Sequence, residues 1–408
     1  MRDTAVVGHA AVFIESNTSG SGAEFLLRAR ELGLVPVFLT AAPERYRFLH
    51  EGAGIDVRTC DTSSETAVTA AVDDIAASMA IKLLTTSSDL YLYVSALQAR
   101  RLGLAGPDPD VIALCQDKAR QTAALHAARI GVPSSFTVRA ECDIYNAIAR
   151  IGLPAVAKPI SGTGSVGVAL VETEPDAIRV LRNLIASKTD VRGCPRQSGA
   201  LLMSYIVGDE FSVEILDGRL IGVTRKHLGS LPHFVEIGHD APAAMPTELS
   251  AKIIYEALSA VSVLGHLEGP AHVELRVHQG GVTIIEVNPR LAGGSIPSLF
   301  RHATGFDSVL AVLRSLLGMP PLTPGASAHG SIRFIVPNHE GRFDISQSRE
   351  QIVRRFGLAE YSLYRNLPTE FRRHNDFRDR IGHIIAIDDD PAVAAWRAEA
   401  AVAFIHQA

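Results

Sequence analysis

The stretch HVELRVHQGGVTIIEVNPRLAGG, residues 272–294, decides the fold and the chemistry that we expect of this chain. Apolar and polar residues alternate in its first part, and the part after QGG is almost wholly apolar, so the pattern predicts two strands joined by a turn. Such a hairpin can bring Glu274 next to Glu286 and Asn288. Two carboxylates and an amide oxygen are hard ligands, of the kind that Mg²⁺ accepts alongside phosphate oxygens and water.

Arg290 places a cation directly after these three ligands. The combination predicts a metal-bound nucleoside triphosphate and a reaction with a charged transition state. The competing interpretation is a surface hairpin with solvated acids. Because Glu286 interrupts a strand too apolar to be exposed, we favour the metal site.

Composition and charge limit the class of protein. A chain of 408 residues predicts two or three domains, and 47% hydrophobic with 20% charged residues predicts a large core rather than disorder. The net charge of −5 argues against a nucleic acid or an anionic membrane as a partner bound by bulk electrostatics. The four cysteines form no CxxC pair, there is no signal-peptide pattern, and no apolar run is long enough for a membrane span, so we expect a cytoplasmic protein.

The first part of the chain alternates strands and helices. The pattern predicts strands at 5–14, 35–40 and 81–85, with helices ending near 32 and covering 67–79. This order is typical of a doubly wound parallel sheet of the Rossmann type. Its glycine-rich turn, NTSGSGAE, is not GxGxxG, so a tight turn into a helix is a better interpretation than a dinucleotide site.

Proline-rich and glycine-rich segments near residues 106–109 and 320–325 indicate domain boundaries. We therefore expect a mixed α/β protein with a Rossmann-like domain over 1–110, a central region over 111–320 and a small α/β subdomain over 321–408. Within the central region, a small lobe of about 133–200 contains the segment PAVAKPISGTGSVGVALVET.

That segment contains GxGxxG at Gly162, Gly164 and Gly167, but a strand follows it where a Rossmann fingerprint requires a helix. The loop therefore predicts a flap between two strands, whose backbone N–H groups can approach phosphate oxygens. Lys158 lies on the strand that enters the flap and can reach the same phosphates. HRD, DFG and GxxxxGK[ST] motifs are absent, which excludes a protein kinase and a P-loop enzyme.

Two further features fit a nucleotide site. Lys118 stands at a predicted helix start, where it opposes the helix dipole; this favours a role with a ligand over that of a solvated surface lysine. The segment LLMSYIVGDEFSVEIL predicts two strands with a short break, whose backbone could bind a purine and whose Glu210 could accept the ribose hydroxyls.

Taken together, these motifs and their order resemble the ATP-grasp superfamily over nearly the whole chain. The resemblance implies that ATP and Mg²⁺ (or Mn²⁺) are bound, with Glu274, Glu286 and Asn288 as metal ligands and Arg290 stabilising the transferred phosphoryl group. The implied nucleotide-binding set is Lys118, Lys158, Gly162, Gly164, Ser165, Met203, Ser204, Tyr205, Ile206 and Glu210. Met203 and Ser204 depart from the family, which usually has two glutamates there, so purine selectivity would depend more on main-chain groups.

Within the superfamily, HFVEIGHDAPA and NPRLAGGSIPSLF look like segments of the L-amino-acid ligases. This implies that Glu236, His239, Arg290, Gly293 and Gly294 lie near the substrates, with Glu236, His239 and Arg290 in catalytic roles. Alone, His239 would more often be a structural histidine. The implied reaction joins an amino acid or similar carboxylate to an amine through an acylphosphate, giving ADP and phosphate.

Three alternatives remain open: a biotin-carboxylase-like enzyme, a ligase for a larger peptide or natural-product amine, and a non-catalytic ATP-binding module. The complete set of metal and phosphoryl residues argues against the last of these. The sequence leaves the oligomeric state open, with a homodimer as the commonest arrangement for soluble enzymes.

Overall fold

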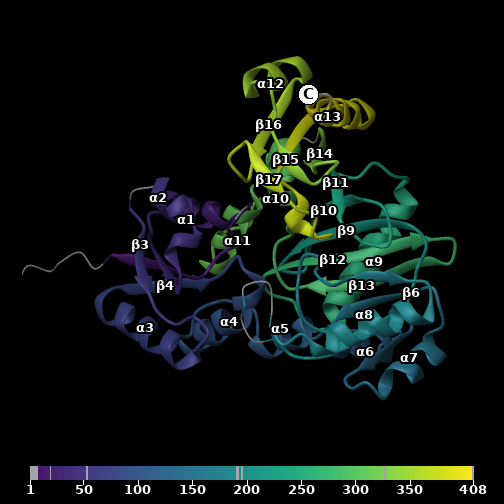
Figure 1. The fold of residues 1–408 in the computed structure, drawn as a ribbon. Coiled ribbons are helices and arrows are strands. Elements are labelled where there is room, and N and C mark those ends of the chain that lie inside the picture. Colours follow the sequence, from purple (N-terminus) through teal and green to yellow (C-terminus); the bar gives the residue numbers. More distant parts are fainter. Residues whose placement is uncertain are drawn as a thin grey trace, which may run out of the picture.

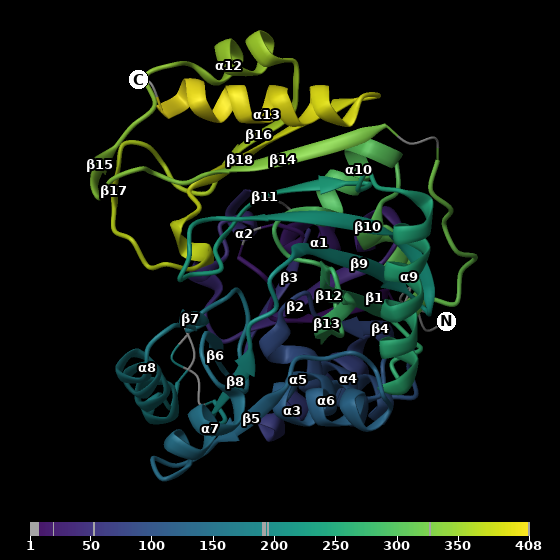
Figure 2. The ribbon, with the colours of Figure 1, turned by 90° about the vertical axis from the view of Figure 1, so that its right-hand side faces the viewer.

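The computed structural model describes residues 8–18, 20–51, 54–189, 193, 196–325 and 328–406. These residues form four β-sheets with helices packed against them (Figure 1), and Figure 2 shows the same chain from the side. Within these ranges, no helix has the length and apolar character needed to cross a membrane.

The N-terminal part of the chain forms a four-stranded parallel sheet in the order β3-β2-β1-β4. Its elements are β1 (His9–Ile14), α1 (Gly22–Glu31), β2 (Val35–Thr40), α2 (Phe48–Glu51), β3 (Asp56–Thr59), α3 (Glu65–Ser78), β4 (Ala80–Thr85) and α4 (Leu92–Arg101). Helices cover both faces of this sheet, so β1 and β2 are buried almost throughout, which explains their continuous apolar sequence. The predicted Rossmann-like sheet is confirmed, while residues 5–7 of its predicted first strand lie outside the described ranges.

A small antiparallel sheet in the order β5-β8-β6-β7 carries the flap. The elements of this part are α5 (Pro109–Gln116), α6 (Lys118–Ala127), β5 (Ser135–Val138), α7 (Asp143–Ile151), β6 (Ala155–Pro159), β7 (Ala169–Val171), α8 (Glu174–Ala186) and β8 (Ala200–Ser204). The predicted flap between two paired strands is confirmed, since β6 pairs with β7. The sheet continues past residue 200, where we expected the small lobe to end, because β8 pairs with both β5 and β6.

The largest sheet has eight antiparallel strands in the order β13-β12-β9-β10-β11-β14-β18-β16. Its strands are β9 (Asp209–Leu216), β10 (Arg219–Leu228), β11 (Glu236–Ala241), β12 (Pro270–His278), β13 (Gly281–Asn288), β14 (His329–Ile335), β16 (Leu358–Leu363) and β18 (Gly382–Asp388). The associated elements are α9 (Thr247–Val263), α10 (Ile296–Thr304), α11 (Ser308–Leu316), α12 (Arg349–Phe356), α13 (Pro391–His406) and the pair β15 (Gly341–Phe343) and β17 (Thr369–Phe371). Strands from both sides of residue 320 share this sheet, and the division into three domains stays a prediction.

The β12–β13 hairpin has the register that its sequence predicts near the two acids. Glu274 pairs directly with Glu286. The register shifts after this pair, so that Leu275 pairs with Ile284 and Ile285 has no partner of its own. This bulge explains why Ile285 and Glu286, which are consecutive, both face the same cavity. The opposite face of the hairpin is buried against α9.

Leu275 is fully buried in that core, so Leu275→Ala should lower the free energy of unfolding by about 2–5 kcal/mol. Removing the side chain loses apolar burial and leaves a cavity under the hairpin. Urea unfolding followed by circular dichroism measures the change. Leu220, which is 40% exposed on β10, is the matched control, and Leu220→Ala should change stability by no more than about 0.5 kcal/mol. Equal effects of the two substitutions would contradict the buried position of Leu275.

Candidate active site

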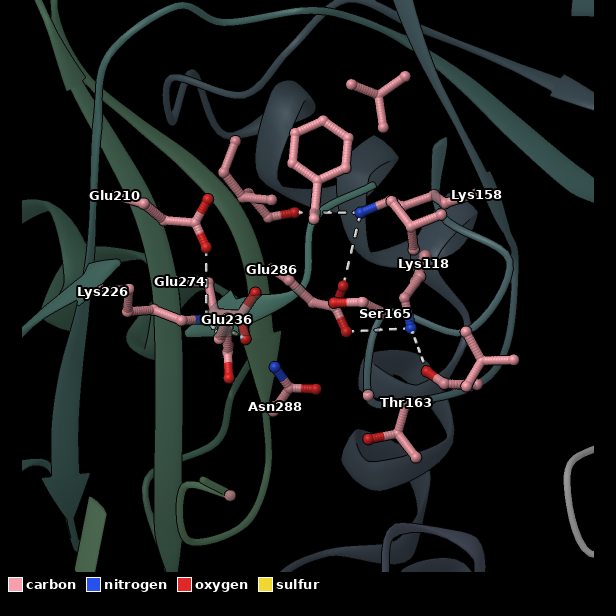
Figure 3. A pocket seen from close by; sticks show the side chains of 18 of the residues that line it. Lys118, Lys158, Thr163, Ser165, Glu210, Lys226, Glu236, Glu274, Glu286 and Asn288 are labelled. Atoms are coloured by element: carbon pink, nitrogen blue, oxygen red, sulfur yellow. Dashed lines mark hydrogen bonds and ion pairs between the residues drawn. The ribbon is translucent and has the colours of Figure 1, made fainter. Parts of the chain in front are cut away.

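A cavity of about 1270 Å³, counted with its part open to solvent, lies between the small sheet and the large sheet. The predicted residues that line it are Lys118, Lys158, Gly162, Gly164, Ser165, Met203, Ser204, Tyr205, Ile206, Glu210, Glu236, Glu274, Glu286, Asn288, Arg290, Gly293 and Gly294. Figure 3 shows charged side chains from both sheets pointing into this space. The structure therefore brings together every predicted site residue except His239.

The two predicted phosphate-binding lysines lie beside Glu286 (Figure 3). Lys118 Nζ is 3.0 Å from Glu286 Oε1, and Lys158 Nζ is 3.5 Å from Glu286 Oε2. Lys118 also donates a hydrogen bond to the flap carbonyl of Gly162 at 2.6 Å. Both lysines are nearly buried, and burial lowers the pKa of Lys158, an effect that the carboxylate of Glu286 partly offsets.

Local sequence explains the position of Lys118. Asp117 is the N-cap of α6, and its carboxylate accepts hydrogen bonds from the backbone N–H groups of Ala119 and Arg120. This cap fixes the helix start that the sequence predicted at Lys118. It holds the helix start, and with it the lysine, against the cavity.

Glu274 is held by a separate set of partners. Its Oε1 lies 3.1 Å from Lys226 Nζ and 3.1 Å from His272 Nε2. The other ring nitrogen of His272 lies 3.0 Å from the buried carboxylate of Glu214, which also accepts a hydrogen bond from Ser212. Burial disfavours charge here, but the two glutamates outweigh it and raise the pKa of His272 to about 9. Burial likewise opposes ionisation of Glu274, but Lys226 and His272 hold its pKa below the usual range.

The three predicted metal ligands suit a metal ion only if a nucleotide supplies further oxygen ligands. Glu274, Glu286 and Asn288 line one side of the cavity and supply two carboxylates and an amide (Figure 3). In the described part of the chain, no three or more His, Cys, Asp or Glu side chains are grouped to hold a metal by themselves. Mg²⁺ suits such an incomplete set, because it keeps several waters and takes further oxygens from phosphates.

Arg290 is fixed by a residue that the sequence did not indicate. Its Nε donates to Asp89, which lies in the short 3₁₀ segment Asp89–Tyr91 after β4. Its Nη1 donates to Leu291 O at 2.8 Å, and its Nη2 reaches Thr163 Oγ1 of the flap at 3.4 Å. The N-terminal sheet region therefore positions the predicted phosphoryl-stabilising cation.

The flap lines the cavity and contacts the C-terminal part of the chain. Gly164 has a positive φ of +68°, and a Cβ there would lie 2.6 Å from Phe377 Cδ1, so the absence of a side chain lets the flap tip approach the C-terminal part of the chain. At the base of the flap, Leu170 N donates to Pro232 O at 2.9 Å, in the loop between β10 and β11.

Residues 205–208 link the small sheet to the large sheet. β8 ends at Ser204 in the small sheet and β9 begins at Asp209 in the large one. Arg276 binds across this link: it donates to Ile206 O at 2.8 Å and to Glu210 Oε2 at 2.9 Å. Its guanidinium also lies 5.4 Å from the centroid of the Tyr205 ring and 5.5 Å from that of Phe234.

The predicted substrate carboxylate, Glu236, faces the cavity but is already paired with two cations. Lys226 Nζ is 2.6 Å from its Oε1, and Arg380 Nη2 is 2.8 Å from its Oε2. Arg380 comes from the segment before β18, and its guanidinium lies 4.1 Å from the centroid of the Phe334 ring. These cations, although burial opposes the charge, hold the pKa of Glu236 well below its usual range.

The prediction that His239 faces the substrates is wrong. The side chain is 0% exposed and lies behind the cavity wall, because the backbone of Gly294 passes over it: a Cβ on Gly294 would be 2.5 Å from His239 Nε2. Both ring nitrogens are buried with no hydrogen-bond partner in the described part of the chain. Burial lowers the pKa of His239 to about 3, so the ring is neutral and is not a base of the usual strength.

The sequence did not indicate several other residues that line the cavity: Lys226, Phe234, His272, Arg276 and Arg380. Arg276 stands two residues after Glu274 on β12, and therefore on the same face, which would have been a usable signal. Lys226 lies in the polar run RKH of β10, which has no comparable pattern. Nothing in the local sequence near Arg380 or Asp89 marks either as part of this site. The cavity is lined by six Lys and Arg side chains and four glutamates, so the lining carries two positive charges in excess before His272 is counted.

The burial of His239 predicts a stability change with pH. The unfolded chain binds a proton at this residue below its ordinary pKa of 6.5, whereas the folded chain does so only near pH 3. Stability conferred by the neutral ring is therefore lost as the pH falls below 6.5, by about 1.4 kcal/mol per pH unit. Between about pH 7.5 and pH 5, the wild type should lose more stability in urea unfolding than His239→Leu, which cannot titrate. If the difference in unfolding free energy between the wild type and His239→Leu stays constant over this pH range, His239 is not a buried neutral histidine.

Comparison with known proteins agrees with this geometry. Residues 151–298 match the ATP-grasp domain family. An uncharacterised protein of Sinorhizobium fredii is 28% identical over 92% of this chain and 78% of its own length. Carnosine synthase 1 of Gallus gallus is 32% identical over 58% of this chain, but the match covers only 27% of that protein.

Among solved structures, an L-amino acid ligase from Bacillus licheniformis superposes with a TM-score of 0.77 over 95% of both chains, at 21% identity. At that identity the likeness concerns the fold. The family match and the cavity between two sheets lead to one conclusion: residues 151–298 form an ATP-grasp domain, and the chain around them shares the fold of that ligase.

Proposed function

We propose that the protein is an ATP-dependent ligase that joins an amino acid, or a similar carboxylate, to an amine. The observation that supports it best is the single cavity in which Lys118, Lys158, Glu274, Glu286 and Arg290 converge. Two similar proteins, a carnosine synthase and an L-amino acid ligase, are named for reactions of the same class.

The lysines and the flap would hold the triphosphate. Lys118 and Lys158 are cations on one side of the cavity, and the flap glycines let backbone N–H groups come close to phosphate oxygens. Glu274, Glu286 and Asn288 would hold Mg²⁺ or Mn²⁺, which when bound neutralises charge on the phosphate oxygens.

Arg290 is placed to stabilise the phosphoryl group during transfer. A substrate carboxylate oxygen attacks the γ-phosphorus, the bond to ADP breaks, and an acylphosphate forms. The amine nitrogen then attacks the acyl carbon, phosphate leaves, and the amine releases one proton. Water would destroy the acylphosphate, so the flap, which is held by hydrogen bonds from Lys118 and Arg290, would protect it.

The substrates would bind at the end of the cavity near Glu236, Gly293 and Gly294. Glu236 keeps unused lone pairs beside its bonds to Lys226 and Arg380, so it can accept a hydrogen bond from a substrate ammonium group. Since His239 is buried behind Gly294, we assign it no contact with the substrates. The cytoplasmic location and the homodimer stay predictions.

A substrate screen tests the proposal. The twenty amino acids, singly and in pairs, are incubated with ATP and Mg²⁺, and both phosphate release and product mass are measured. A ligase gives one phosphate per amide bond. Phosphate release that needs bicarbonate and yields no amide would indicate a carboxylase, and the absence of phosphate release with every acceptor would indicate a binding module.

Lys118→Ala and Lys158→Ala should each weaken binding of a non-hydrolysable ATP analogue by at least about tenfold, or about 1.4 kcal/mol. Each removes a cation that faces the triphosphate. Isothermal titration in the presence of Mg²⁺ gives the affinities. Arg120→Ala, an exposed cation on the same helix, is the control and should bind as the wild type does. If the lysine variants also bind as the wild type does, the phosphate assignment is wrong.

Glu286→Gln should lower turnover by at least about a hundredfold, equivalent to about 3 kcal/mol of transition-state stabilisation. The substitution keeps the shape of the side chain and removes the charge that would hold the metal ion. Steady-state phosphate release measures the loss, and circular dichroism checks that the fold is retained. Near-normal turnover in this variant would refute the metal role of Glu286.

A further inference from the structure

The two carboxylates proposed to hold the metal ion are held in different ways. Glu274 is paired with Lys226 and with His272, and His272 is in turn bound to the buried Glu214. None of these three partners is a phosphate-binding lysine. Glu274 is therefore supported from inside the large sheet and can stay in place when a nucleotide enters.

Glu286 has no such support among the described residues. Its ion-pair partners there are Lys118 and Lys158, the two cations proposed to bind phosphate (Figure 3). The side chains of the lysines are only 10% and 5% exposed, so the carboxylate supplies most of the compensation that these buried charges need. A phosphate group that approaches the lysines must therefore compete with Glu286.

We propose that Glu286 occupies the phosphate-binding lysines as an internal competitor until a metal ion takes it over. Glu274, positioned by His272 and Glu214, is by contrast the fixed ligand of the pair. The inference rests on the proposed nucleotide site and adds an order of events to it. A metal ion that pairs with Glu286 releases both lysines, and the phosphates then replace the carboxylate as their partner.

The exchange couples the metal ion to the nucleotide. The metal ion pairs with Glu286 and the phosphates pair with the lysines, so the binding of either one separates Glu286 from the lysines and favours the binding of the other. By linkage, the metal ion must tighten nucleotide binding by the same factor as the nucleotide tightens metal binding, and such factors are commonly about 5–150-fold. A nucleotide without metal must instead break the lysine–glutamate pairs without compensation for the carboxylate.

The test compares the affinity for a non-hydrolysable ATP analogue in excess EDTA and in Mg²⁺, by isothermal titration. In EDTA, Glu286→Gln should bind the analogue at least about fivefold more tightly than the wild type, because its lysines are released. This is the opposite of the loss expected when a metal ligand is removed. The gain in affinity on adding Mg²⁺ should be smaller in this variant than in the wild type.

Glu274→Gln is the matched control. It removes the same charge from the opposite residue of the hairpin, but Glu274 does not pair with either phosphate-binding lysine. In EDTA its affinity should stay within about twofold of the wild type. An equal gain in both variants would overturn the proposal, since it would reflect only a less negative cavity.

Unchanged or weaker binding by Glu286→Gln in EDTA would also overturn the inference. Should this variant not fold, Glu286→Ala, which frees the lysines in the same way, replaces it. The failure of the exchange can be distinguished from the failure of the nucleotide site. If the wild type binds the analogue with Mg²⁺ but the two variants behave alike, only the exchange is refuted. A wild type that does not bind the analogue in either condition refutes the nucleotide site and the exchange together.

Discussion

The register of the β12–β13 hairpin is the constraint on which the rest of the site depends. It sets Glu274 opposite Glu286, and the bulge at Ile285 turns Glu286 toward the cavity while Val287 stays in the core. A shift of one residue would move every side chain of a strand to the other face, so the acids would enter the apolar packing against α9. The burial of Val273, Leu275 and Val287 makes that shift costly.

Buried charge is the second organising feature. The lysines, arginines and glutamates of the cavity lie far enough from water that each needs a partner of opposite sign, and the structure supplies these partners in chains. An unpaired charge at such a position costs several kcal/mol. The remaining excess of positive charge suits a polyanion such as the nucleoside triphosphate that we propose as the ligand.

The site also depends on segments far apart along the chain. Asp89, from the N-terminal sheet region, fixes Arg290, and Arg380, from the last part of the chain, fixes Glu236. Phe377 packs against the flap tip at Gly164. The cavity is therefore complete only when the parallel sheet, the small sheet and the C-terminal strands of the large sheet are all in place.

The sequence by itself determined the local elements and the side chains that they carry. Alternating and continuous apolar patterns predicted the hairpin, the parallel strands and the flap, because hydrophobic periodicity depends only on which face of an element is buried. Pairing within a hairpin is a local matter too, so Glu274 could be placed beside Glu286. Only the tertiary structure decided that β8 belongs to the small sheet, that Asp89 and Arg380 join the site, and that the backbone of Gly294 covers His239. These contacts join residues tens to hundreds of positions apart, and their formation depends on how whole sheets pack, which no local pattern of residues records.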